Sequence, residues 1–225
     1  MPKNKSRGRC LLCNSVLGKS GMTKHLQSCM KNNLHGKRQS SGRQVREGSS
    51  FHIIVEGYGL PGYWMHLLVS AATKLEKLDH FLRDIWLECC GHLSVFKIEG
   101  IRYSSWPMTD YGEKGMSKKI GDLLSPGLKF LHDYDMGTTT EIVLKVISEQ
   151  EMQVDSVEIL ARNEAPFIKC DNCDDVSVYV CSGCIYAGEG WLCGKCVQDH
   201  ECGEEMLLPV VNSPRVGMCG YTGNN

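Results

Sequence analysis

The chain has 225 residues, of which 42% are hydrophobic and 23% charged, a composition that is typical of a folded protein and excludes a disordered one. No apolar run approaches the roughly 20 residues that span a bilayer, and the first residues lack the apolar stretch of a secretory signal. The net charge of −1 conceals an asymmetry, because residues 1–46 carry eleven Lys or Arg and no acidic residue, against 14 basic and 26 acidic residues in the remainder. Such a basic arm suits contact with a polyanion, and a solvated basic tail explains it equally well.

The basic arm contains the first metal-ligand motif, Cys10-x2-Cys13-x11-His25-x3-Cys29. Two cysteines on a tight turn, followed by His and Cys four apart on one helix face, predict a ββα zinc finger with Cys as the last ligand. Ser20 is expected to cap the helix, whose small core includes Leu17, Met22 and Leu26. So small a unit needs its metal to fold.

Nucleic-acid contact is one interpretation of the finger, and a protein partner or a purely structural role are the alternatives. The candidate contact residues are Lys19, Lys24, Gln27, Lys31, Lys37 and Arg38. We assign residues 1–34 to the finger and residues 35–50, which are rich in Gly, Ser and Arg, to a flexible basic linker.

A central α+β domain is predicted for residues 51–165. A strand over 51–57 and a Gly-Pro turn precede a helical repeat from Tyr63 to Leu78, and a second helix is expected from Asp79 to about Gly91. Trp64, Trp86 and Tyr63 are core candidates on these helices rather than a ligand platform. Strands follow at 93–98, 100–106, 127–135, 138–150 and 157–163. This order predicts a mainly antiparallel sheet with two helices on one face, flanked by small zinc-binding modules.

Several short motifs of this domain resemble the plasmid Ri open-reading-frame-three-like family, which includes insertion-element passenger proteins that carry the resolvase label TnpR. The matching residues are His92-Leu93, Phe96-x-Ile98, Tyr134-Asp135-Met136-Gly137 and the closing element Asn212 to Tyr221. The resemblance covers about residues 51–165 and 206–223, and the sequence departs from the family pattern at Met136 and Thr138. It implies an α+β fold without a known activity, together with a mobile-element association.

The resolvase label is not carried over, because a serine recombinase needs a nucleophilic Ser among several Arg. Arg83, Arg102 and Arg162 are instead scattered over three expected elements. An unrecognised enzyme could use the central acidic and imidazole groups, namely His92, Glu99, Asp110, His132, Asp133 and Asp135. Dispersed surface or core-edge positions explain these residues better. The vicinal pair Cys89-Cys90 is interpreted as two small buried side chains in preference to a pair of reactive thiols.

A second set of ligands lies between residues 170 and 202 and contains seven cysteines and one histidine. Eight such donors fill two tetrahedral zinc sites and leave no position for water or substrate. Together with the finger, twelve residues are predicted zinc ligands: Cys10, Cys13, His25, Cys29, Cys170, Cys173, Cys181, Cys184, Cys193, Cys196, His200 and Cys202. Zinc on reduced thiolates is favoured over disulfides, since there is no export signal.

The pairing within the second set is open at this point. A cross-braced module joins the first and third CxxC pairs and is favoured, whereas a sequential module would place the first four cysteines on one metal. Residues 166–205 form this module, and residues 206–225 are expected to complete the core with a strand at 204–211 and a Gly-rich tail in which Cys219 is no ligand.

These patterns predict a cytoplasmic, non-enzymatic protein with about three zinc ions and a basic finger that contacts nucleic acid. The alternatives are a zinc-stabilised protein-interaction module without nucleic-acid binding, and an enzyme that uses the central His and Asp residues. No membrane contact is expected.

Overall fold

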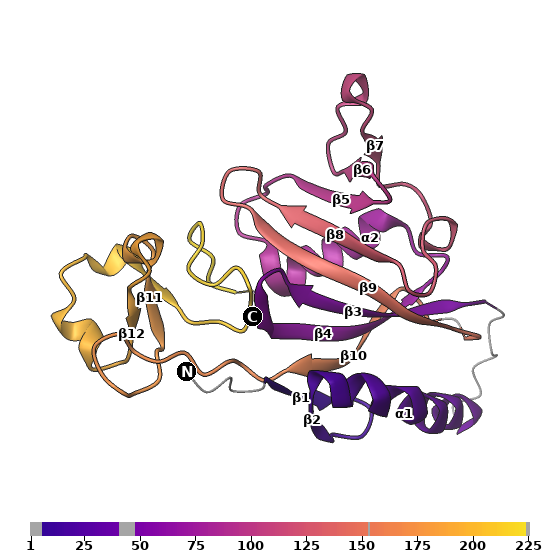
Figure 1. Cartoon of the computed structure of the whole chain (residues 1–225), viewed down its shortest axis with the longest axis horizontal. Coiled ribbons are helices and arrows are strands. Elements are labelled where there is room, and N and C mark those ends of the chain that lie inside the picture. Colours follow the sequence, from indigo (N-terminus) through magenta and orange to yellow (C-terminus); the bar gives the residue numbers. More distant parts are fainter. Residues whose placement is uncertain (1–5, 41–47, 153, 224–225) are drawn as a thin grey trace.

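The computed structural model describes residues 6–40, 48–152 and 154–223. Its main feature is a large, strongly twisted β-sheet (Figure 1). In chain order the strands of this sheet are β1 (Arg7–Cys10), β2 (Val16–Gly18), β3 (Ser50–Gly57), β4 (Leu60–Ser70), β5 (Ser94–Ile98), β6 (Ile101–Ser104), β7 (Lys114–Gly115), β8 (Lys129–Tyr134), β9 (Thr140–Gln150) and β10 (Val157–Asn163).

In space the strands follow the order β2-β1-β10-β4-β3-β9-β8-β5-β6-β7. The pairs are antiparallel except β6 with β7, which is parallel. The predicted α+β class and mainly antiparallel sheet are therefore confirmed. The five strands expected between residues 93 and 163 all form, with bounds shifted by a few residues.

One face of the sheet is covered by α2 (Leu75–Leu82) and by the π-helical turn η1 (Arg83–Leu87) that continues it. Leu75, Leu78 and Leu82 of α2 and Trp86 of η1 are fully buried in the main apolar cluster. That cluster takes alternate residues of the central strands, such as Ile53 and Val55 in β3, because successive side chains of a strand point to opposite faces.

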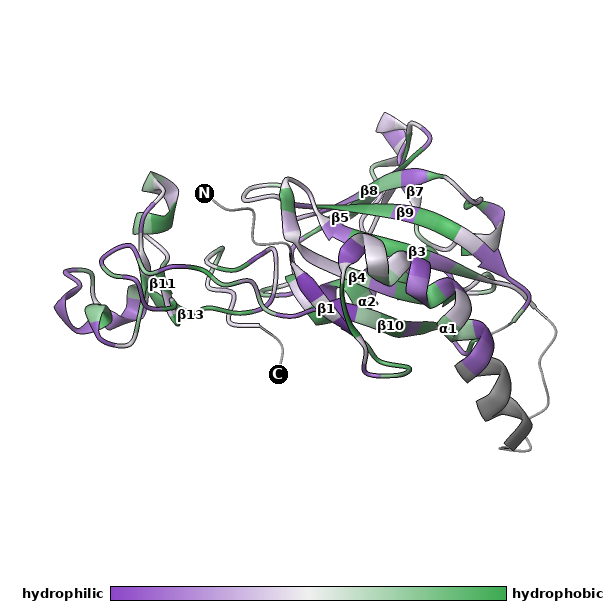
Figure 2. Cartoon of the chain, turned by 60° about the horizontal axis from the view of Figure 1, so that its bottom comes forward, coloured by the Kyte–Doolittle hydropathy of each residue, from purple (hydrophilic) through white to green (hydrophobic). Residues whose placement is uncertain are grey.

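The other face of the sheet is covered by α1 (Lys19–Ser40), which packs near β1, β2 and β10 (Figures 1 and 2). A second apolar cluster joins Leu26 and Met30 of α1 to Trp64 of β4 and Leu160 of β10. The two helices thus lie on opposite sides, α2 over the main cluster and α1 over the second.

The helix expected from Tyr63 to Leu78 was wrong over most of its length, because residues 60–70 form β4 and helix begins only at Leu75. From Tyr63 to Ser70 every residue of β4 is buried, since the two clusters cover both of its faces. A strand buried on both sides loses the alternation of polar and apolar residues, so its sequence cannot be told from a buried helix by periodicity.

The second expected helix also differs, since Asp79 lies inside α2 and the helical turns end at Leu87. Gly91 therefore does not cap it, and lies in the following loop with a φ of 79°. Part of the predicted flexible linker is helical as well, because α1 continues to Ser40 and β3 begins at Ser50. Residues 41–47 of that linker lie outside the described residues.

A small module projects from one end of the large sheet (Figure 1). It contains a three-stranded sheet of order β12-β11-β13 and several short 3-10 turns. The strands are β11 (Tyr179–Cys181), β12 (Trp191–Leu192) and β13 (Leu207–Pro209).

The strand expected at 204–211 therefore pairs inside the small module, with β11, and does not return to the large sheet. The segment after β13 nevertheless reaches the core, where Val211 packs against the main cluster and Val216 is part of it. Arg215 of this segment is fully buried.

Five further short helices complete the described chain: η2 (Thr109–Tyr111), η3 (Ile120–Asp122), η4 (Cys184–Ala187), η5 (Cys196–Asp199) and η6 (Glu204–Met206). Within the described ranges, no helix is long and apolar enough to cross a membrane.

Candidate metal centres

The four predicted ligands of the finger lie together. Cys10 ends β1, Cys13 lies in the turn before β2, and His25 and Cys29 come from consecutive turns of α1. Their donor atoms are all within 4.8 Å of one another. Cys10 Sγ lies 3.8 Å from Cys29 Sγ, and Cys13 Sγ lies 3.2 Å from His25 Nε2. The turn is tight enough to place Asn14 in the left-handed region, with a φ of 63°.

The thiols of the finger differ in acidity. Hydrogen bonds from the side chain and backbone of Ser15 lower the pKa of Cys13 to about 6. Burial, reinforced by the neighbouring thiols, raises the pKa of Cys29 to about 12. A cation is what would allow all three sulfurs to be thiolates together, because it removes the repulsion between them.

The finger is part of the large sheet rather than a free module. Its first strand, β1, pairs with both β2 and β10, so the finger hairpin forms one end of the sheet. Gly8 permits this close approach, because a Cβ at this position would lie 2.4 Å from the backbone oxygen of Arg162 and 2.5 Å from the ring of Trp64.

The eight predicted donors of the C-terminal module form two groups with the cross-braced pairing. One group joins Cys170 and Cys173 with Cys193 and Cys196, and the other joins Cys181 and Cys184 with His200 and Cys202. The sequential alternative, with the first four cysteines on one metal, is not the pairing seen here. The β11–β12 hairpin explains the cross-braced pairing. Because its two strands are antiparallel, the chain before β11 lies beside the chain after β12, so the ligands of the two groups alternate along the sequence.

Distances within the module match those of the finger. Cys173 Sγ lies 3.6 Å from Cys193 Sγ and 3.7 Å from Cys196 Sγ, and Cys184 Sγ lies 3.7 Å from Cys202 Sγ. Backbone N–H groups of Cys196 and Lys195 lower the pKa of Cys193 to about 7. Tight CxxC turns direct such N–H groups at the sulfur, which prepares it to bind a metal as thiolate.

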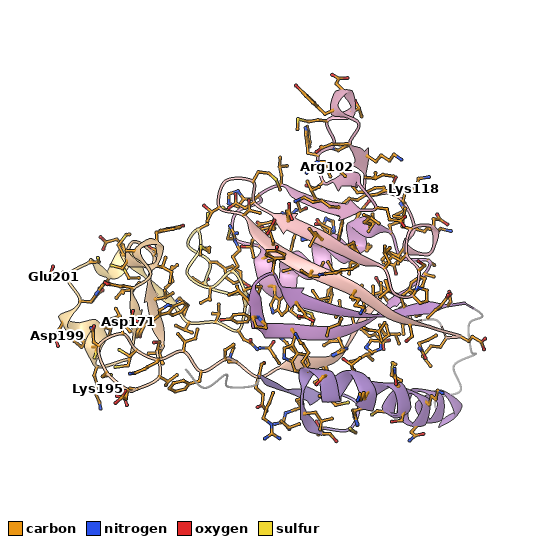
Figure 3. The ribbon with its side chains drawn as sticks, viewed as in Figure 1. Arg102, Lys118, Asp171, Lys195, Asp199 and Glu201 are labelled. Carbon is orange, nitrogen blue, oxygen red and sulfur yellow. The ribbon has the colours of Figure 1, made fainter. Side chains whose placement is uncertain are left out.

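The described cysteines are all reduced, and the three groups could hold metal ions. Thiolate and imidazole sets of four fit zinc, and they leave no coordination position free for water or substrate. The charged side chains at the outer end of the module, such as Lys195, Asp199 and Glu201, point away from the large sheet (Figure 3).

A fourth group was missed by sequence reasoning. It contains Cys89 and Cys90, His92 two residues later, and Cys219 from the C-terminal segment. Cys219 was expected to be no ligand, but the structure places it in a group of possible donors, with its Sγ 3.3 Å from His92 Nε2 and 3.9 Å from Cys90 Sγ. The vicinal pair is also not buried as expected, because Cys89 is half-buried and Cys90 is exposed.

The residues proposed for nucleic-acid contact have different surroundings. Lys24, Gln27 and Lys31 are exposed on α1. Lys19, in contrast, is held by Glu56 of β3, with Nζ 2.7 Å from Oε2. The side chains of Lys37 and Arg38, in the last turns of α1, lie outside the described residues.

The acidic and imidazole groups considered for an enzyme are not brought together as a set. His132 is fully buried and shares a 2.7 Å hydrogen bond with Asp79 of α2. Asp133 points to the other face of β8 and pairs with Lys97. Glu99 is exposed in the turn between β5 and β6, and Asp110 is exposed in η2.

Only His92 and Asp135 of those groups are neighbours, with Nε2 and Oδ2 3.5 Å apart, and they adjoin the fourth cysteine group. The three arginines checked for a recombinase centre also have separate partners: Arg83 pairs with Glu88, Arg102 with Glu113, and Arg162 donates to the Asn212 carbonyl.

Comparisons with known proteins give little more. No family model matches the chain, and no curated protein matches it. Among solved structures it is similar to the protein of unknown function MM3350 from Methanosarcina mazei Go1, with 14% identity and a TM-score of 0.43 over 52% of this chain and 68% of that one. Membership of the plasmid Ri open-reading-frame-three-like family stays a prediction from the sequence motifs.

Proposed function

We propose that this is a non-enzymatic, zinc-binding protein that associates with nucleic acid through the outer face of α1. The observation that carries the proposal is the exposure of Lys24, Gln27 and Lys31 at i, i+3 and i+7 of one helix, while Met22 and Leu26 on the opposite side are fully buried. No acidic residue occurs among residues 1–46 to oppose them.

The spacing of these side chains suits a phosphate backbone. Seven residues of helix separate Lys24 from Lys31, a rise of about 10 Å, which corresponds to roughly three phosphates along one strand of duplex DNA. Lysine ammonium groups act as point charges on phosphate, and the Gln27 amide can donate to phosphate or sugar oxygens. A single finger of this kind supplies affinity without strong sequence preference.

The proposed role of zinc is to fix this surface. The metal joins α1 to the β1–β2 hairpin, and β1 is a strand of the large sheet. The helix is therefore presented on a rigid body, and its cations lose little freedom when they bind. Lys19 is excluded from the contact because Glu56 already holds it.

The proposal includes a reducing, cytoplasmic location and an association with mobile DNA. The thirteen cysteines, all of them reduced, suit a compartment that keeps thiols free for metal. The mobile-element association follows from the sequence resemblance alone.

Binding to mixed-sequence DNA and RNA fragments across a salt series tests this function. Replacing Lys24 and Lys31 by Ala should weaken binding to duplex DNA and reduce the slope of log K against log salt by about 1.8, because two phosphate contacts are lost. The matched control replaces Lys114 and Lys118, two exposed lysines far from α1, and should leave the slope unchanged (Figure 3 labels Lys118).

If the two double variants change the affinity and the salt slope equally, the assignment of the contact surface to α1 is refuted. If the wild-type protein shows no salt-dependent binding, the nucleic-acid function itself is wrong, and the zinc-stabilised protein-interaction module becomes the better description.

A further inference from the structure

The three predicted zinc groups use ten of the thirteen cysteines of the chain. The remaining three are Cys89, Cys90 and Cys219, and the fold brings all of them to one place together with His92. They come from two segments that are about 130 residues apart, and no spacing rule links them. Every cysteine of this protein therefore belongs to a group of four donors.

The sulfur–sulfur separations in this fourth group are those of a tetrahedral metal site. A metal–sulfur bond of about 2.3 Å places two thiolates of a tetrahedron about 3.8 Å apart. Cys89 Sγ and Cys90 Sγ are 3.6 Å apart, and Cys90 Sγ and Cys219 Sγ are 3.9 Å apart. The finger and the module show 3.8 and 3.6 Å for comparable sulfur pairs. His92 Nε2 faces the same point, 2.9 Å from Cys90 Sγ.

The loop that carries three of the donors is fixed by the protein itself. The backbone N–H groups of Cys89 and His92 both point at the hydroxyl oxygen of Tyr134, at 3.4 and 3.3 Å. Gly91, with its φ of 79°, turns the chain so that His92 comes back over Cys90, and its N–H donates to Glu88 Oε1 at 2.6 Å. These contacts orient the donors in the way that outer partners orient metal ligands.

The fourth donor is held in an uncommon backbone conformation. Cys219 has a φ of 47°, in the left-handed region that residues with a side chain rarely adopt. Such strain persists where surrounding structure holds it, and here it turns the Cys219 thiol toward His92.

Charged neighbours complete the surroundings. Arg215, fully buried, donates from Nη2 to Cys89 Sγ at 3.4 Å and to Asp135 Oδ2 at 2.8 Å. Three thiolates, one imidazole and a divalent cation carry a net charge of −1, and the Arg215 guanidinium lies against the Cys89 sulfur while it also pairs with the Asp135 carboxylate. Asp135 Oδ2 is also 3.5 Å from His92 Nε2.

We propose that Cys89, Cys90, His92 and Cys219 form a fourth zinc site, which clasps the C-terminal segment to the loop after η1. Four protein donors close the coordination sphere, so the site is a structural clasp and not a centre for metal catalysis. It differs from the other three because none of its ligands is buried, and Cys90 and Cys219 are exposed. Its zinc is therefore the most accessible of the four to chelators.

Native mass spectrometry of the full chain, loaded with excess zinc and then exchanged into a metal-free buffer, tests the site. The expected result is four zinc ions in the wild-type protein and three in Cys219→Ser and in His92→Ala. His80→Ala is the matched control, since His80 is exposed and belongs to none of the four groups, and it should keep four. Cys173→Ser is the positive control and should lose metal from the module.

Thiol alkylation of the wild-type protein gives a second measurement that needs no variant. Cys90 and Cys219 should resist the reagent in the zinc-loaded protein and react after a chelator is added. Three zinc ions in the wild-type protein, or immediate alkylation of both exposed thiols in the zinc-loaded protein, would overturn the proposal.

Discussion

Replacing Leu26 by Ala should destabilise the large sheet and not only the finger. Leu26 has no exposed surface and belongs to the same buried cluster as Trp64 of β4 and Leu160 of β10. The substitution removes three carbons, about 2.4 kcal/mol of transfer free energy, and the cavity left behind raises the cost to about 3–4 kcal/mol. This is a large share of the roughly 5–15 kcal/mol that stabilises a typical domain.

Urea unfolding of the zinc-saturated protein, followed by circular dichroism, measures the change in the free energy of unfolding. Native-state hydrogen exchange then locates it, and protection should fall for amides of β4 and β10 as well as for α1. Leu11→Ala is the matched control, since Leu11 lies in the same finger and is 51% exposed, and its effect should stay within about 0.5 kcal/mol. If Leu26→Ala reduces protection in α1 alone, the finger is an independent unit and the reasoning from the shared cluster fails.

Three more predictions concern the core, the finger strand and the module. Burial lowers the pKa of His52 to about 4 and of His66 to about 3, so the folded state holds both neutral while the unfolded chain takes up protons below about pH 6.5. The free energy of unfolding should therefore fall as the pH drops below 6.5, by about 1.4 kcal/mol per histidine at pH 5.5. A variant with Leu at both positions should show a flatter dependence of this free energy on pH. Equal slopes for the wild-type protein and the variant would contradict this reasoning. Gly8→Ala should lower the free energy of unfolding, measured by urea or heat, by about 1–3 kcal/mol, because the new Cβ would meet backbone and ring atoms at 2.4 and 2.5 Å. Gly18→Ala is the control and should lower it much less, since the nearest atom there is 3.8 Å away. Similar losses in the two variants would rule out the close contact as the cause. Removing zinc with a strong chelator should abolish hydrogen-exchange protection in β11 and β12 and leave β3 and β9 protected, because the small module has too little core to fold alone; persistent protection of β11 would refute this dependence.

The sequence predicted well what depends on local spacing. The finger ligands and the eight donors of the module lie within short runs, so their grouping follows from CxxC pairs and helix geometry. The strands from 93 to 163 were predicted because they alternate or carry β-branched residues between turn signals. The cross-braced pairing was the favoured one of two.

What depends on distant contacts could not be predicted in the same way. Residues 63–70 were assigned to a helix because their apolar residues do not alternate with polar ones. The alternation is absent because the finger buries the second face of β4, and residues 63–70 themselves contain no sign of that distant partner. Cys219 was set aside because its partners lie about 130 residues earlier. Gly8 was a signal that the finger packs against other strands. A glycine inside a strand indicates that another backbone or ring approaches closely at that position.

The pairing of β1 with β10 also has a consequence for the order of events during synthesis. The finger can close on its metal once residue 29 has emerged, because all four donors are local, whereas its strand partner at residues 161–163 is made much later. Met22, Leu26 and Met30 have no sheet to cover them in that interval. The growing chain therefore carries an uncovered apolar helix face until β10 has been made, and such a face favours aggregation during that interval.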